Sequence, residues 1–69
     1  MGTLEDMIEL VSSQDNIDDI MYNAYDKMKE KLTDADLHTL ADIHFNMTGR
    51  LDKANKLYIE LSHFNEGLM

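Results

Sequence analysis

Residues 32–61, LTDADLHTLADIHFNMTGRLDKANKLYIEL, decide the fold. On both sides of Gly49 apolar residues recur every three or four positions, which is the spacing of a helix that buries one face. Thr33, followed three residues later by Asp36, has the pattern of a capping box at a helix start. Gly49 stands where a helix ends in a residue of positive φ, so a tight connection is predicted there. The stretch therefore predicts two helices, at about 34–48 and 51–64.

The first half of the chain carries two more helix signals. Thr3 with Asp6 has the pattern of another capping box, and Asp15 or Asn16 precedes a second apolar stripe. These signals predict helices at about 4–12 and 16–31. No stretch alternates between apolar and polar residues, so no strands are expected. We predict an all-α fold in which residues 1–69 form one small domain of four short antiparallel helices, joined by connections of two to four residues.

The apolar stripes predict the core. Four methionines fall on inward-facing positions, and the helix at 34–48 has a broader apolar surface, typical of a central helix that touches several neighbours. Other apolar residues lie off the stripes and favour self-association as a homodimer. The methionines are Met7, Met21, Met28 and Met47; the broad surface is Leu37, Leu40, Ala41, Ile43, Phe45 and Met47; the residues off the stripes include Leu10, Ile59, Leu68 and Met69.

Charge is distributed unevenly along the chain. The 69 residues contain fourteen acidic residues and six lysines and arginines, for a net charge of −8. Residues 1–26 hold seven of the acidic residues and no lysine or arginine. This balance disfavours direct binding to nucleic acid, which needs a basic footprint, and favours a protein partner with a basic surface. The alternative is that the acidic residues only keep a small apolar-rich protein soluble.

Two tyrosines share the helix at 16–31 with several carboxylates. Tyr22 lies off the apolar stripe and Tyr25 near its edge, so both are candidates for an interface that combines aromatic contact with charge. The alternative is that both rings lie flat over the rim of the core. The predicted partner-binding residues are Glu5, Glu9, Asp15, Asp18, Asp19, Tyr22, Tyr25 and Asp26.

Catalysis and metal binding are not expected. The chain has no cysteine, its serines are explained as helix-end residues, and a bundle of this size has little room for a substrate cleft. His38 and Asp42 are one helical turn apart, but we interpret them as a solvated pair without a third ligand. A calcium loop counted from Asp34 has Thr39 and Phe45 where glycine and glutamate are required. We predict no enzyme activity, no cofactor and no metal.

Two stretches resemble known families. Residues 40–61 resemble a tetratricopeptide hairpin, although Asp42 stands where that family carries a small residue. Residues 16–58 resemble the Hha/YmoA group of small four-helix regulators through Asn16-Ile17-Asp18, Leu32-Thr33-Asp34 and Lys56-Leu57-Tyr58. That group acts by binding a nucleoid protein. The closing segment of that group is missing here, and the acidity is out of character for it.

These observations predict a small acidic regulator or inhibitor that docks on a basic surface of a partner protein. One expected partner is a nucleic-acid-binding enzyme whose basic channel is blocked by carboxylates that imitate phosphates. An origin in a virus or mobile element would suit such a protein. The alternatives are a self-associating homodimeric module and a small nucleoid-associated transcription modulator. No apolar run approaches the ~20 residues of a membrane span, and a cytoplasmic location is expected.

Overall fold

The computed structural model describes residues 2–68, which form four helices. They are α1 (Thr3–Ser13), α2 (Ile17–Lys27), α3 (Asp34–Thr48) and α4 (Leu51–Glu66). No strand occurs within residues 2–68, so the predicted all-α fold is confirmed.

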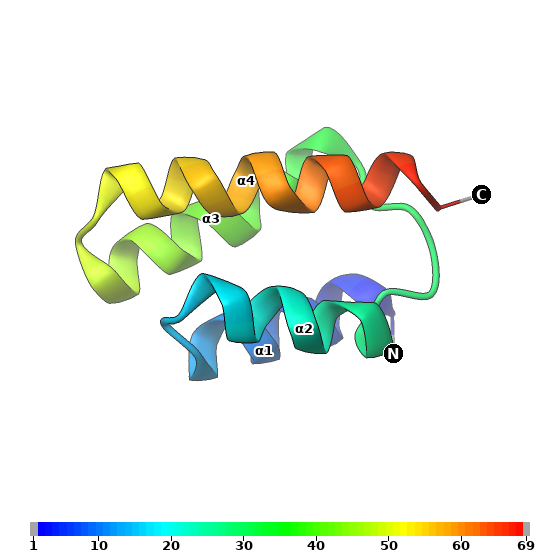
Figure 1. Cartoon of the computed structure of the whole chain (residues 1–69), viewed down its shortest axis with the longest axis horizontal. Coiled ribbons are helices and arrows are strands. Elements are labelled where there is room, and N and C mark those ends of the chain that lie inside the picture. The colour runs from blue at the N-terminus through cyan, green and yellow to red at the C-terminus, as the bar shows by residue number, and fades with distance from the viewer. Residues whose placement is uncertain (1, 69) are drawn as a thin grey trace.

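Helices α1 and α2 form one layer and α3 and α4 the other (Figure 1). Among the described residues α1 packs against α2 and α3, and α4 packs against α2 and α3. Consecutive helices run in opposite directions, whereas the neighbours α1 and α3 run in the same direction, as do α2 and α4 (Figure 1). The two layers leave two broad outer faces on a body that measures 32 × 20 × 19 Å.

The connection between α2 and α3 differs from the prediction. Helix α2 ends at Lys27 rather than near residue 31, so the connection spans residues 28–33 and is longer than two to four residues. Met28 and Leu32 are both buried, and the extended backbone at Met28 leaves the helix. The side-chain amide of Asn65 on α4 accepts from the Leu32 N–H (2.7 Å) and donates to the Leu32 carbonyl (2.9 Å). Burial and this clasp replace the last helical turn.

Three of the helix-end predictions are confirmed. Asn16 caps α2 by accepting the N–H of Asp18 at 2.8 Å. Thr33 and Asp36 form the capping box at α3, with both hydrogen bonds at 3.1 Å. Gly49 ends α3 with φ of 69°, a conformation that favours glycine. The tight connection to α4 therefore forms as the sequence indicates.

The predicted capping box at Thr3 is wrong. Thr3 is the first residue inside α1, its side chain is buried, and Gly2 occupies the N-cap position without a side-chain bond. Thr3 is therefore buried within the first turn and does not cap the helix.

The core lies between the layers and draws on every helix. Met7 and Met28 are buried as predicted, and Met21 packs against the core from a half-buried position. Leu10, expected off the stripes, is a core residue, because α1 turns Met7, Leu10 and Val11 inward together. The buried cluster is Met7, Leu10, Val11, Ile17, Ile20, Ala24, Met28, Leu32, Leu37, Leu40, Leu57 and Leu61.

His44 is an unusual member of the interior. It is fully buried on α3, and neither ring nitrogen has a hydrogen-bond partner among residues 2–68. Burial lowers the pKa of His44, since the charged imidazolium loses hydration; Asp15 opposes the shift and Lys53 adds to it. A neutral imidazole with two unpaired nitrogens is therefore enclosed in the interior, which costs stability.

Candidate protein-binding surface

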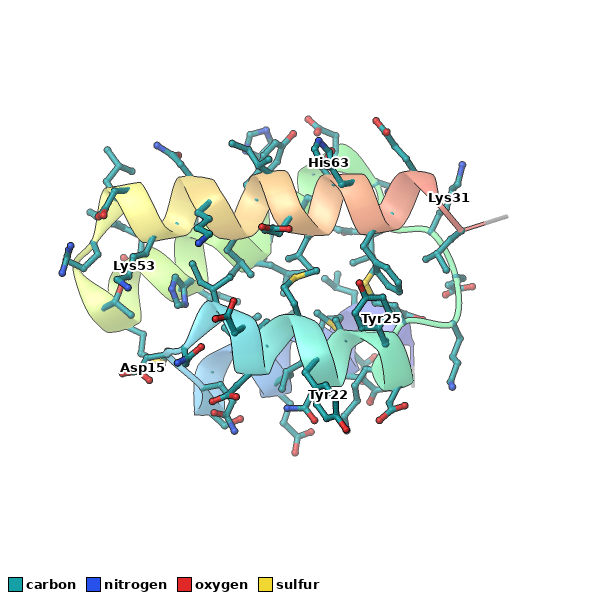
Figure 2. The ribbon with its side chains drawn as sticks, in the orientation of Figure 1. Asp15, Tyr22, Tyr25, Lys31, Lys53 and His63 are labelled. Carbon is teal, nitrogen blue, oxygen red and sulfur yellow. The ribbon has the colours of Figure 1, made fainter. Side chains whose placement is uncertain are left out.

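The outer side of α2 presents an aromatic ring between two carboxylates. Asp18, Tyr22 and Asp26 follow one another at intervals of four residues, so they form a ridge with steps of about 6 Å. Ile20 and Ala24 on the opposite side of the helix are fully buried, which turns this ridge outward. Tyr22 is 75% exposed and extends away from the α3/α4 layer (Figure 2).

Tyr25 has a different environment from Tyr22. It lies at the edge of α2 that faces α4 (Figure 2), where its ring meets Phe64 edge-to-face, with centroids 4.6 Å apart. This contact combines the two predicted alternatives: the ring packs on the rim of the core and is still 64% exposed. Tyr25 therefore borders the outer side of α2 and is held in place by α4.

Helix α1 adds carboxylates to the same layer. Glu5 and Glu9 are four residues apart and therefore lie one turn apart on α1. Both are exposed, because Met7 and Val11 point into the core from the other side of the helix. Since α1 and α2 are neighbours, both helices face outward from the layer together. We call the exposed set on this layer the acidic face: Glu5, Glu9, Asp18, Asp19, Tyr22 and Asp26.

Asp15 is separate from the acidic face. It lies in the connection between α1 and α2, at the same end of the bundle as Lys53 of α4 (Figure 2). Asp15 lines a hollow together with Arg50 and Lys53. Six of the eight predicted partner-binding residues therefore share the acidic face, Tyr25 borders it, and Asp15 lies away from it beside two basic residues.

Among the residues that the structure describes, the charges of the acidic face have no ion-pair partners. The ion pairs among residues 2–68 are Asp34–His38 at 3.2 Å and Arg50–Asp52 at 3.3 Å, and neither involves α1 or α2. Residues 1–28 carry seven acidic residues and one lysine, a net charge of −6, which leaves −2 for residues 29–69. The α1/α2 layer is therefore strongly negative, and the α3/α4 layer is nearly balanced.

The predicted pair between His38 and Asp42 is wrong. His38 pairs with Asp34, four residues before it, and its ring stacks on Tyr58 with centroids 4.6 Å apart. The Tyr58 hydroxyl donates to Asp34, and this hydrogen bond raises the pKa of Tyr58. Within residues 2–68 no three histidine or acidic side chains gather as metal ligands would.

Sequence reasoning missed a second surface on the outer side of the α3/α4 layer. Phe45, predicted to face inward, is 39% exposed there, and Leu51 is 61% exposed. Met47, also predicted to face inward, is 41% exposed and lines the hollow beside Asp15 instead. The wide apolar arc of α3 was interpreted as the mark of a central helix, but α3 touches α1 and α4 alone among the described helices. The breadth of that arc was the available signal, since it exceeds what two neighbours cover.

Comparison with known proteins returns no match to a family model, a curated protein or a solved structure. The two resemblances noted in the sequence therefore remain hypotheses. In the described part of the chain no helix has the length and apolar character needed to cross a bilayer.

Proposed function

We propose that this protein is a small regulator or inhibitor that binds a basic surface of a partner protein through its acidic face. The observation that carries the proposal is the ridge on α2: Tyr22 is 75% exposed, and an unpaired carboxylate stands one turn away on each side. Exposure of a tyrosine costs a protein little free energy and by itself indicates no function. A tyrosine between two uncompensated carboxylates, however, offers a partner contact area and charges that orient it.

The two kinds of side chain have different tasks. The carboxylates steer a basic partner toward the face and set its orientation, because opposite charges attract over about a Debye length. Tyr22 and the exposed edge of Tyr25 supply apolar area that water leaves when the complex forms. The regular spacing of the carboxylates supports a nucleic-acid-binding partner, whose basic channel would accept the carboxylates in place of phosphates. We place this interaction in the cytoplasm.

Salt dependence tests the electrostatic part of this proposal. The immobilised full-length protein would capture its partner from a lysate of the native host at ~0.05 M and ~0.5 M salt. We expect recovery to fall at least about tenfold at the higher salt, because exposed charges are then screened within a few ångströms. A partner retained equally at both concentrations would show that charge does not lead recognition.

A further inference from the structure

The outer side of the α3/α4 layer carries a shallow groove with an apolar wall. It is lined by Ala41 and Phe45 of α3 and by Leu51, Ala54 and Tyr58 of α4, and its volume is about 330 Å³. Phe45 and Leu51 protrude from it, while the small side chain of Ala54 is buried at its base. The core residues of α3 and α4 point toward the α1/α2 layer, so this groove lies on the opposite broad face of the molecule from the acidic face.

We propose that this groove binds a second copy of the chain, forming a two-fold symmetric dimer through the α3/α4 layer. The first argument is self-complementarity, which a two-fold interface requires because the same patch serves both subunits. The patch contains protruding side chains, Phe45 and Leu51, and a hollow above Ala54 that receives them. The polar rim is also complementary to itself, since the Asn55 amide can donate a hydrogen bond and the Asp42 carboxylate can accept one.

The distribution of charge between the two layers also favours the α3/α4 face. Residues 1–28 carry −6 and residues 29–69 carry −2, so the α3/α4 face is the broad face with the smaller repulsion between copies. Dimerisation there places the two strongly negative layers on the outside, as far apart as the assembly allows. Contact through the acidic faces would oppose −6 to −6 across a few ångströms.

The size of the face sets the expected affinity. The whole side measures 32 by 20 Å, about 600 Å², and the groove with its rim covers part of it, so each copy buries less area than most specific complexes do. We therefore expect a dimer that dissociates in the micromolar range. This interface differs from the one suggested by the sequence: Leu10 is buried, Leu68 packs against the core, Ile59 lies outside the groove, and Met69 lies outside the described residues.

Sedimentation of the full-length protein over about 5–300 μM tests the proposal. We expect the mass to rise from one chain of 8.0 kDa to two as concentration increases. Leu51→Lys is expected to weaken the dimer at least tenfold. Ile59→Lys is the matched control on the same helix, 53% exposed and outside the groove, and it should leave the dimer intact. A one-chain mass at every concentration, or equal losses from L51K and I59K, would overturn the proposal.

Salt separates this inference from the proposed function. Both copies are negative, so raising the salt should strengthen the dimer slightly, whereas the same change should release a basic partner from the acidic face. A dimer that weakens steeply with salt would contradict an interface built on the apolar groove. If the dimer forms, each assembly presents two acidic faces on opposite sides.

Discussion

Charge reversal on the α2 ridge, as D18K/D26K, is expected to weaken partner binding about 100-fold. Each substitution replaces an attraction to a basic surface by a repulsion, and close interfacial charge pairs are coupled by roughly 1.5–7 kcal/mol. Both carboxylates are exposed and make no ion pair with the described residues, so the substitutions remove no salt bridge seen in the structure. The neutral variant D18N/D26N removes the attraction alone, and an intermediate loss of about tenfold is expected. Binding would be measured by titration of the captured partner.

The matched control is E30K/E66K, which changes the net charge by the same amount outside α1 and α2. Glu30 and Glu66 are exposed and make no ion pair among the described residues. Circular dichroism would show whether each variant keeps its helices, since Asp18 also stands in the first turn of α2, where a negative charge is favourable. Equal losses from both double variants would mean that only the net charge matters and that the ridge is not the contact surface.

Replacement of His44 by leucine is expected to stabilise the protein by about 1–3 kcal/mol at neutral pH. The imidazole is fully buried with both nitrogens unpaired, and an unsatisfied buried polar group costs about this much. Leucine has a similar volume and requires no hydrogen-bond partner, so it fits a buried position. Urea unfolding of the two proteins measures the difference. A less stable H44L protein would show that the imidazole is satisfied in solution.

The advantage of H44L should increase in acid. Because the folded pKa of His44 lies below its ordinary value of 6.5, the unfolded chain takes up a proton that the folded chain refuses. Above pH 6.5 the imidazole is neutral in both states, and His44 adds no pH dependence to the free energy of unfolding. As the pH falls from 6.5 toward the folded pKa, protonation of the unfolded chain lowers the free energy of unfolding. The wild type should therefore lose more stability than H44L between pH 7.5 and pH 5.5. His63→Gln, which removes an exposed imidazole, controls for the loss of a histidine as such.

Local chemistry explains why three of the helix ends were predictable. The cap at Asn16, the capping box at Thr33 and the positive φ of Gly49 depend on residues within three positions of one another. The end of α2 was not predictable in this way. It depends on the clasp between Leu32 and Asn65, which are 33 residues apart, and on burial of Met28 and Leu32 across the bundle.

The candidate surface was predictable in part for the same reason. Tyr22 is exposed because it lies opposite Ile20 and Ala24 on α2, and the helical periodicity of the sequence predicts this position. The separation of Asp15 from the other carboxylates, and the contact of Tyr25 with Phe64, depend on where α4 lies. The exposure of Phe45 and Leu51 depends on how few neighbours α3 has, which helix periodicity alone does not specify.

Site-specific photo-crosslinking of the purified complex tests the central claim most directly. A benzophenone side chain would replace Tyr22 on the acidic face in one protein and Ile59 on α4 in another; both positions are exposed. The account predicts that position 22 crosslinks to a segment of the partner rich in lysine and arginine, and that position 59 does not. Crosslinks to the partner from position 59, with none from position 22, would place the contact on the α3/α4 layer and contradict the account.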